Sequence, residues 1–335
     1  MPSSSIPKLD PGCGRISCAL HGKSTVLSEL ASTYPLKLIS PRVLSRPDVA
    51  IVYVLSYGGG LVGGDKIQLS VKVDKGSSLM VLSQVKELLH PSTIESFFKI
   101  SHPQGSTKVF TTRLQQRQIS SPSNTFHDDI ESSDDGATIQ KMDFSVSPGG
   151  VLYLLPDPVT CFRSASYKQI QSFHLAKDAS LVLLDWITSG RKSRGEEWVF
   201  SRYYSLNEIF IDGVRLAKDA LLLEEGGGGG GGHGKRTLAE RLAPYSCYAN
   251  VILYGPQVRD VIRELTVAYE KMSIMKLASP PELLWSLSPI GGAEQGTMVR
   301  VAGKETELVK DWLKKSLGGL SQVVGADVYR RAFAQ

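Results

Sequence analysis

Apolar and polar residues alternate along much of the chain, a pattern that predicts a protein built mainly from β-strands. In residues 66–73 every second side chain is apolar, which places one face of a strand in the core and the other in water. Residues 109–119, 139–146 and 170–175 behave similarly. The sequence therefore predicts half-buried strands at these positions.

Two short segments are apolar throughout and predict strands that are covered on both faces. They are residues 151–155 and 181–184. A further segment, residues 208–214, contains Asp212 followed by Gly213. This dipeptide is a strong signal for a tight turn between two paired strands.

Helical periodicity is convincing only towards the C-terminus. Apolar residues recur every three or four positions in residues 258–272, and Pro256 stands where the first turn of a helix tolerates proline. A second helix is predicted for residues 304–317, ended by Gly318 and Gly319. The predicted fold class is therefore mostly β, a β-rich α+β protein with two helices in the C-terminal half.

Composition places the chain among ordinary globular proteins. Its 335 residues are 41% hydrophobic, enough for a sizeable core, and this excludes wholesale disorder. The net charge of +5 is small for this length and does not require a nucleic-acid or membrane partner. The longest apolar run, residues 50–55, is far shorter than the ~20 residues of a membrane span.

The N-terminus lacks the apolar segment of a secretory signal, so we expect a cytoplasmic protein. Its four cysteines would then be reduced thiols, and none of them forms a C-x-x-C pair. They are Cys13, Cys18, Cys161 and Cys247. The histidines do not have zinc-site spacing, so the sequence leaves any metal ligands unknown.

Two glycine-containing segments match parts of nucleotide-binding motifs but lack their context. Residues 22–24 read Gly-Lys-Ser like the end of a P-loop, yet Ser17 stands where that motif needs a glycine. The glycines at 58, 60 and 63 match a dinucleotide fingerprint, but the residues after them alternate with period two instead of starting a helix. Without a helix N-terminus there is no dipole to hold a phosphate. We therefore expect no cofactor bound by this chain itself.

Three ordered blocks carry a resemblance to a known family. Residues 58–65 read GGGLVGGD, residues 155–163 read LPDPVTCFR and residues 181–198 read LVLLDWITSGRKSRGEEW. The glycine block and the GR-x-x-RGE-x-W block together resemble the urease accessory protein UreD family, called UreH in some bacteria. The resemblance runs from about residue 14 to about residue 223, with a weaker continuation through the C-terminal helices.

The resemblance implies a non-enzymatic maturation chaperone. UreD-like proteins bind apo-urease and, with UreF, recruit the GTPase UreG, which carries nickel. The family fold is an elongated, mostly β structure with two helices, and family models have nickel moving through an interior channel of the UreD-type subunit into the urease active site. GTP would then be bound by UreG, and nickel would only be in transit through this chain.

The resemblance also implies one UreD-like domain at residues 14–320, between a flexible N-terminus at 1–13 and a C-terminal tail at 321–335. Loop insertions are expected at about residues 88–105, 122–136 and 224–236. The second insertion is polar and acidic. The third contains seven consecutive glycines, whose high chain entropy predicts a mobile loop.

The glycine block most simply serves backbone geometry, through positive φ angles or a close approach of strands. Its members are Gly58, Gly59, Gly60, Gly63 and Gly64. Asp65 follows them and could cap the turn by accepting hydrogen bonds from backbone amides, as in an Asx-turn. Alternatively, its carboxylate could stand at the mouth of a channel.

Asp185 and Glu196 each have two possible roles. Asp185 interrupts an apolar strand, where a buried carboxylate without a partner is unfavourable. Arg191 or Arg194 could be its partner in a structural ion pair, or a solvated interior passage could keep it ionised. The same two interpretations apply to Glu196, which follows a glycine in the RGE sequence.

Two other classes of function stay open: a β-rich protein-binding module without a metal role, and an enzyme with an unrecognised site. The resemblance itself implies UreF, UreG and apo-urease as partners, with neither nucleic acid nor membrane. A conduit for a metal ion needs ligands that bind weakly, because tight chelation would stop the transfer. The lack of a closed Cys/His site is therefore compatible with nickel handling.

Overall fold

A computed structural model of the protein describes residues 9–41, 48–83, 136–225, 236–272, 279–292 and 295–333. The chain divides into two units, residues 1–84 with 136–335, and residues 85–135. Every described residue belongs to the first unit. Four of the sequence predictions lie wholly or almost wholly outside the described residues. They are the strand at 109–119, the insertions at 88–105 and 122–136, and the glycine run at 226–232.

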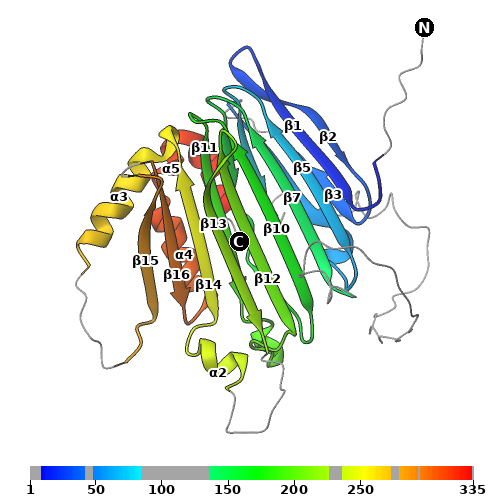
Figure 1. Ribbon diagram of the computed structural model, residues 1–335, viewed down its shortest axis with the longest axis vertical. Coiled ribbons are helices and arrows are strands. Elements are labelled where there is room, and N and C mark those ends of the chain that lie inside the picture. Colours follow the sequence, from blue (N-terminus) through cyan, green and yellow to red (C-terminus); the bar gives the residue numbers. More distant parts are fainter. Residues whose placement is uncertain are drawn as a thin grey trace. The chain divides into compact units, whose positions relative to one another are not determined.

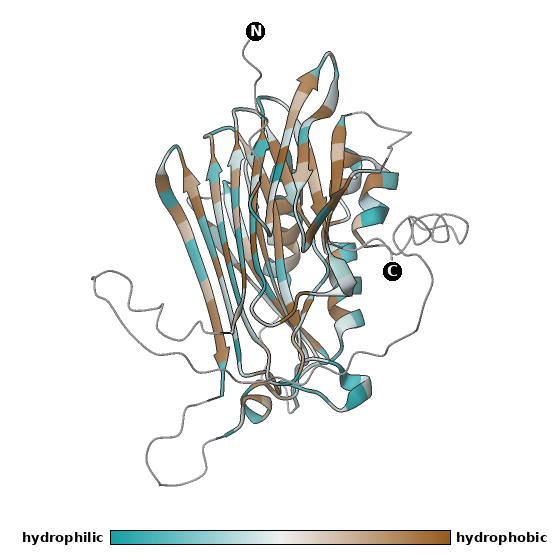
Figure 2. Ribbon diagram, turned by 90° about the vertical axis from the view of Figure 1, so that its right-hand side faces the viewer, coloured by the Kyte–Doolittle hydropathy of each residue, from teal (hydrophilic) through white to brown (hydrophobic). Residues whose placement is uncertain are grey.

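Two mixed β-sheets of the first unit pack face to face (Figure 1, Figure 2). The strands of sheet A are β1 (Cys13–His21), β2 (Ser24–Ser32), β5 (Lys66–Val73), β7 (Thr138–Val146), β10 (Ser166–Leu175), β12 (Arg202–Ile211) and β13 (Val214–Glu224). Their spatial order is β13-β12-β10-β7-β5-β1-β2. The strands of sheet B are β3 (Leu36–Ile39), β4 (Val49–Ser56), β6 (Ser78–Leu82), β8 (Val151–Leu154), β9 (Val159–Thr160), β11 (Ser180–Thr188), β14 (Cys247–Tyr254), β15 (Leu283–Ile290) and β16 (Gly296–Gly303). They follow the order β15-β16-β14-β11-β8-β6-β4-β3, and β9 pairs with β11.

Consecutive strands in the middle of the chain alternate between the two sheets. In sheet B, β4, β6, β8 and β11 lie side by side and are parallel, and in sheet A the same holds for β5, β7, β10 and β12. The turns that lead from sheet A to sheet B continue the parallel pairing of the strands. The Val151 N–H donates to the Ser77 carbonyl, and the Ser180 N–H donates to the Gly150 carbonyl, both at 2.9 Å. The described connections from sheet B to sheet A, those from β4 to β5, from β8 to β10 and from β11 to β12, therefore leave from the opposite end of the strands.

The strands predicted from alternation are confirmed wherever they fall in described residues. The side chains of β5 alternate between exposed and buried along its whole length, and residues 139–146 and 170–175 fall within β7 and β10. The two wholly apolar segments form β8 and part of β11, inside sheet B. Asp212 and Gly213 have φ angles of 47° and 81° and join β12 to β13 in a two-residue turn.

The two predicted helices are confirmed as α3 (Arg259–Glu270) and α4 (Thr306–Ser316). Figure 2 shows helices on the outer side of sheet B, where α3 packs against β15 and β16 and α4 against β14 and β16. None of the helices in the described part of the chain is both long and apolar enough to cross a membrane.

Further short helices were not predicted. They are α2 (Leu238–Leu242), α5 (Leu320–Val324) and α6 (Ala326–Ala332), with the 3-10 turns η1 (Tyr57–Gly59), η3 (Lys192–Arg194) and η4 (Pro256–Val258). Each is too short for a helical period to stand out in the sequence. The segment expected to be a C-terminal tail thus contains α6, and it buries Val324, Val328 and Phe333.

Two hydrophobic clusters include residues of both sheets. The larger cluster stacks Phe144 and Phe173 of sheet A, with ring centroids 4.7 Å apart, and includes Leu183 and Ile252 of sheet B. The smaller cluster consists of Cys161, Ile187, Trp198, Phe200, Tyr203, Leu223 and Leu238. The two clusters are separate, and the residues between them form the candidate site.

Candidate functional site

A layer of polar side chains separates the two hydrophobic clusters. On β12, Tyr203 belongs to the smaller cluster and Ile209 to the larger, and the inward-facing residues between them are Ser205 and Asn207. On β11, Asp185 likewise lies between Leu183 of the larger cluster and Ile187 of the smaller cluster. We call the following set the polar layer: Gln169 and Gln171 of β10, Asp185 of β11, Ser205 and Asn207 of β12, Asp219 of β13, Asn250 of β14 and Arg300 of β16.

Neutral donors from sheet A hold the Asp185 carboxylate, which comes from sheet B. Ser205 Oγ and Asn207 Nδ2 lie 2.6 Å and 2.7 Å from Asp185 Oδ2, and Gln169 Nε2 lies 3.3 Å from Oδ1. No lysine or arginine among the described residues pairs with Asp185. Of the two alternatives for Asp185, the ion pair with Arg191 or Arg194 is therefore not formed.

Burial raises the pKa of Asp185. The hydrogen bonds from Ser205 and Asn207 lower this pKa in part, and the nearby charge of Asp219 raises it further. The Asp185 residue as a whole is partly accessible to solvent. Three of its neighbours, Gln169, Ser205 and Asn207, are each at most 5% exposed.

Asp219 is a second carboxylate in the layer and was not singled out from the sequence. Asn250 Nδ2 lies 2.7 Å from Asp219 Oδ2, and Arg300 Nη2 lies 2.9 Å from Asp219 Oδ1. The Asp219 side chain is 16% exposed and that of Arg300 is 53% exposed. The layer therefore reaches solvent on the side of β13 and β16.

Three amide oxygens of the layer lack a hydrogen-bond partner among the described residues. They are Gln171 Oε1, Asn207 Oδ1 and Asn250 Oδ1. Buried polar atoms are normally paired, and exceptions call for an ion, a water molecule or a function. Because all three atoms are acceptors, the layer can offer oxygen ligands to a cation or to water.

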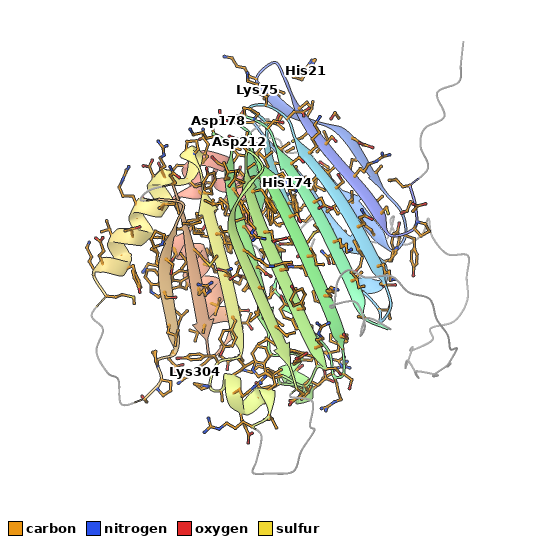
Figure 3. The ribbon with its side chains drawn as sticks, in the orientation of Figure 1. His21, Lys75, His174, Asp178, Asp212 and Lys304 are labelled. Carbon is orange, nitrogen blue, oxygen red and sulfur yellow. The ribbon has the colours of Figure 1, made fainter. Side chains whose placement is uncertain are left out.

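Nitrogen and sulfur ligands are scarce in this region. No group of three or more His, Cys, Asp or Glu residues with metal-site geometry occurs in the described parts of the chain. Burial raises the pKa of the Cys161 and Cys247 thiols to about 12, so they stay protonated at neutral pH. The imidazole of the exposed His174 stacks on Phe210 at 5.0 Å, and Figure 3 shows His21 at one end of the strands.

Glu196 forms the ion pair that the sequence left open. Arg191 Nε and Nη2 lie 2.8 Å and 2.7 Å from its two carboxylate oxygens, and the Arg163 N–H also donates to it. The hydrogen bonds from Arg191 are the main cause of the lowered pKa of Glu196. Arg194 is exposed and makes no ion pair with another described residue. This pair lies in the connection after β11, outside the polar layer.

The connection between β11 and β12 also contains a residue with strained backbone, Trp198. Trp198 is buried with a positive φ of 53°, its N–H donates to the Ser189 carbonyl at 2.6 Å, and its indole Nε1 donates to the Tyr245 carbonyl at 3.2 Å. The Arg191 guanidinium lies 3.9 Å from the centre of the Phe162 ring. These contacts fix the loop over the smaller cluster.

The glycine block follows β4 and has a partly confirmed backbone role. Gly58, Gly59 and Gly64 have positive φ angles, as predicted. Gly60 is extended, with a φ of 172°, and no described atom lies within 4 Å of where its Cβ would be. The alternative of a close strand approach is therefore not found there. At Gly63 the atom nearest to where a Cβ would lie is the carbonyl oxygen of Gly136, at 3.6 Å, which is an ordinary contact distance.

Asp65 accepts a backbone hydrogen bond as predicted, but from the residue three positions before it and not in an Asx-turn. Its Oδ2 accepts a hydrogen bond from the Val62 N–H at 2.8 Å, and its own N–H donates to the Val62 carbonyl at 3.0 Å. Asp65 thus stabilises the turn before β5. No described contact joins it to Asp185 or to the rest of the polar layer.

Sequence reasoning missed most of the polar layer. Ser205 and Asn207 lie at inward-facing positions of β12, and Asp219 lies on β13, and these polar residues interrupt the apolar alternation that marks a half-buried strand. Polar side chains on the inward face of a strand are the signal that could have identified them. Figure 3 shows Lys75, Asp178 and Asp212 with His21 at one end of the strands and Lys304 at the opposite end, so these polar groups at the ends of the strands do not add to the layer.

Comparisons with known proteins agree over nearly the whole chain. The family model described as UreD urease accessory protein matches residues 11–333. The chain is 34% identical to urease accessory protein 4 of Cryptococcus neoformans var. grubii, over 98% of this chain and 97% of that protein. It is 29% identical to urease accessory protein D of Oryza sativa subsp. japonica, over 98% and 97%. It is 31% identical to urease accessory protein UreD of Sorangium cellulosum, over 96% and 84%.

Proposed function

Because the chain belongs to the UreD urease accessory protein family, we propose that it is a cytoplasmic maturation scaffold that binds apo-urease and, with UreF and UreG, supports nickel delivery into the urease active site. The family consists of accessory proteins, so the protein is not a catalytic enzyme. The nickel ion is cargo in this proposal and not a resident cofactor.

The polar layer is the observation that carries the nickel part of the proposal. It crosses the protein interior between two hydrophobic clusters and contains a carboxylate, Asp185, that is held by neutral donors only. No protein cation neutralises such a carboxylate, so a passing cation can pair with it and favour its ionised form. Oxygen ligands bind Ni²⁺ less tightly than thiolates or imidazoles, and this permits release to the next site.

The nucleotide chemistry of nickel delivery is proposed to lie with UreG. Gly22 and Lys23 form the turn between the antiparallel strands β1 and β2, and the glycine block leads into β5. Neither glycine segment precedes a helix whose N-terminus could bind a phosphate. This geometry supports a division of labour in which the present chain supplies the scaffold and the passage.

The direct test compares Asp185→Asn with the wild-type protein in two assays, a pull-down of urease and UreF and the nickel-dependent activation of apo-urease. The amide has nearly the shape of the carboxylate, so we expect the complex to persist while activation falls. Asp143→Asn is the matched control, because Asp143 is an exposed carboxylate of β7 outside the polar layer. It should behave like the wild type.

Two results would contradict the proposal. Full activation by Asp185→Asn, with the complex intact, would favour the alternative that the protein is a protein-binding module without a metal role. Loss of the complex together with activation would assign Asp185 to the stability of the fold.

A further inference from the structure

The two sheets have four edge strands, and three of them are protected against pairing with another chain. The edges are β2 and β13 in sheet A and β3 and β15 in sheet B. β2 packs against β3 and β4, β3 has only four residues, and β15 contains Pro289. Covering, shortness and proline are common devices that keep the edge of a sheet from binding further strands.

β13 lacks such protection in its second half. The strand has 11 residues and no proline. Its bulge at Leu216 and the charged residues Lys218 and Asp219 all come before Ala220. The leucines that follow are uncharged and accessible, with Leu221 36% and Leu222 47% exposed. A long, apolar and exposed edge of this kind favours the addition of a strand.

The pairing with β12 shows which backbone groups of β13 face the free edge. The Arg202 N–H donates to the Ala165 carbonyl at 3.1 Å, so the backbone groups of Arg202 point away from β13. Arg202 stands opposite Glu224, and in an antiparallel ladder both members of such a pair point away from each other. Every second residue back to the bulge then directs its N–H and C=O to the free edge. These residues are Glu224, Leu222, Ala220 and Lys218.

The free edge is closed at both ends and open between them. At one end Arg241 Nη2 of α2 lies 2.9 Å from the carbonyl oxygen of Glu224. At the other end the turn between β15 and β16 reaches β13, since a Cβ on Gly291 would lie 2.8 Å from Leu216 Cδ1. Between these ends no described group hydrogen-bonds to the outward backbone of β13. The opening therefore has the length of a short strand.

The space beside the free edge faces β15 of the other sheet. Asp219 contacts Asn250 of β14 and Arg300 of β16, so β13 lies opposite these two strands. β15 is the next strand beyond β16. In Figure 1, β15 and β16 lie beyond β13, and no described strand of sheet A passes in front of them. Sheet A thus lacks a strand at the position opposite β15.

β15 turns an exposed apolar side chain towards that position. Its Leu284 pairs with Ala302, on the same face of sheet B as Arg300, and is 43% exposed. Ser286 pairs with Arg300, which reaches Asp219, so the next row of side chains contains both Leu284 and Leu221. An added strand would cover these two leucines while it pairs with β13.

The overhang of β15 admits a single strand but not a second copy of the protein. If β13 paired with β13 of a second copy around a twofold axis, β15 of each copy would have to lie opposite β13 of the other. That space is already filled by β14 and β16, which contact Asp219. A strand without a second sheet behind it meets no such obstacle.

We propose that the free edge of β13 binds an extended segment of another protein as an additional antiparallel strand of sheet A. Main-chain hydrogen bonds to Lys218, Ala220 and Leu222 provide the affinity in this mode of recognition, and alternate side chains provide the specificity. The segment has an apolar side chain over Leu221 and Leu284. It has an acidic side chain opposite Lys218, which forms no ion pair with the described residues. The inference rests on the fold and is independent of nickel.

The test is a titration of a fluorescent peptide that copies residues 214–224 with the full-length protein, followed by fluorescence anisotropy. The peptide is a strand without a sheet behind it. When its Ala220 lies opposite Leu222 of the protein, its Glu224 lies opposite Lys218 and its Leu221 lies over Leu284. We expect saturable binding of one peptide per protein chain.

N-methylation of the peptide distinguishes strand pairing from other contacts. Methyl groups on the nitrogens of Ala220 and Leu222 remove the donors that face β13, so binding should be abolished. Methyl groups on Leu221 and Leu223 lie on the opposite edge of the bound peptide and should leave the affinity unchanged. The two peptides have the same composition and charge, so each is the control for the other.

Ala220→Pro is the corresponding change in the protein. It removes an N–H of the free edge and leaves the hydrogen bonds to β12 in place. Binding should weaken by about tenfold or more, because one lost hydrogen bond accounts for up to about tenfold and the ring also separates the strands. Leu284→Ser should weaken binding by about threefold or more, since an apolar contact on the facing sheet is lost.

Leu222→Lys adds a charge to the free edge and should weaken binding by about threefold. Val26→Lys is its control, because Val26 is 42% exposed and lies on β2, the opposite edge of sheet A. It adds the same charge and should bind the peptide like the wild type. Equal weakening in both variants would mean that net charge, and not the free edge, governs binding.

Four other results would overturn the proposal. They are absence of peptide binding, equal loss with both methylated peptides, full binding by Ala220→Pro, and a dimer of the wild-type protein that Ala220→Pro dissociates. The last would make a second copy the occupant. Circular dichroism shows whether each variant is folded, and the methylated peptides test the wild-type protein itself. No measurement involves nickel or urease, so the outcome is separate from that of the proposed function.

Discussion

Asp185 and Glu196 are two carboxylates of the same sequence block with opposite surroundings. Glu196 receives both arms of the Arg191 guanidinium, so its charge is neutralised within the loop after β11. Asp185 receives only hydroxyl and amide donors from the facing sheet. A neutralised carboxylate can hold a loop in place, whereas one held by dipoles retains a charge that a mobile cation can use. The difference supports an architectural role for Glu196 and is the basis of the role proposed for Asp185.

The largest expected effect tests the architectural side of this comparison. Trp198→Ala removes the central ring of the smaller cluster and its hydrogen bond to the Tyr245 carbonyl. We expect the free energy of unfolding to fall by about 3–5 kcal/mol, with urease binding and activation lost together. Urea denaturation measures the first and the pull-down the second. A variant that stays stable and binds urease but fails in activation would instead give Trp198 a part in the proposed nickel delivery.

A double-mutant cycle sharpens the comparison, with a smaller effect. Glu196→Gln and Arg191→Gln should each lower stability, and the double variant should lose much less than the sum, because both changes break one ion pair. Asp185→Asn combined with Arg191→Gln should instead be additive within about 0.5 kcal/mol, as expected for sites without a shared partner. Urea midpoints of the six proteins decide the matter. Coupling between Asp185 and Arg191 would contradict the structure.

The smallest expected effect is an opposite pH dependence of the two sites. The pKa of Asp185 is raised by burial, so its contribution to stability is greatest below its unfolded pKa of about 3.9 and is lost as the pH rises through the higher folded pKa. Asp185→Asn should therefore gain stability relative to the wild type as the pH increases above about 4.

The pKa of Glu196 is lowered by Arg191, which reverses the sign. Its contribution is present above the unfolded pKa of about 4.3 and disappears as the pH falls through the lower folded value. The stability deficit of Glu196→Gln should thus shrink in acid. Thermal unfolding of both variants and the wild type between pH 3 and 8 provides the measurement, and parallel curves would refute the distinction.

Local sequence rules predicted the elements but not their partners. Period-two alternation located β5, β7 and β10, and Asp212-Gly213 located the hairpin between β12 and β13. Which carboxylate Arg191 would reach depends on how the loop after β11 folds back, and no local pattern contains that information. The polar layer requires the register between strands of two facing sheets, a long-range property.

No sequence pattern predicted that successive strands alternate between the two sheets. The turns that carry the chain from sheet A to sheet B read DKGS at 74–77, SPGG at 147–150 and AKDA at 176–179, and they share no motif. The structural regularity comes from parallel pairing and not from repeated residues. A search for internal sequence repeats therefore finds none.

That regularity makes the middle of the protein a short two-sided solenoid. Its rungs are β4 with β5, β6 with β7, β8 with β10, and β11 with β12, and each rung supplies one strand to each sheet. The strands of the two inner rungs pair with those of the rungs before and after them, whereas the two end rungs also pair with other strands of the sheets. Stability in such arrays is approximately a sum of rung and nearest-neighbour terms, and folding can spread from one rung to the next. As the chain leaves the ribosome, the rungs can assemble in order of synthesis. The last rung, β11 with β12, carries Asp185, Ser205 and Asn207, and the members of the polar layer on β13, β14 and β16 follow it in the chain, so the layer is completed only after every rung has been synthesised.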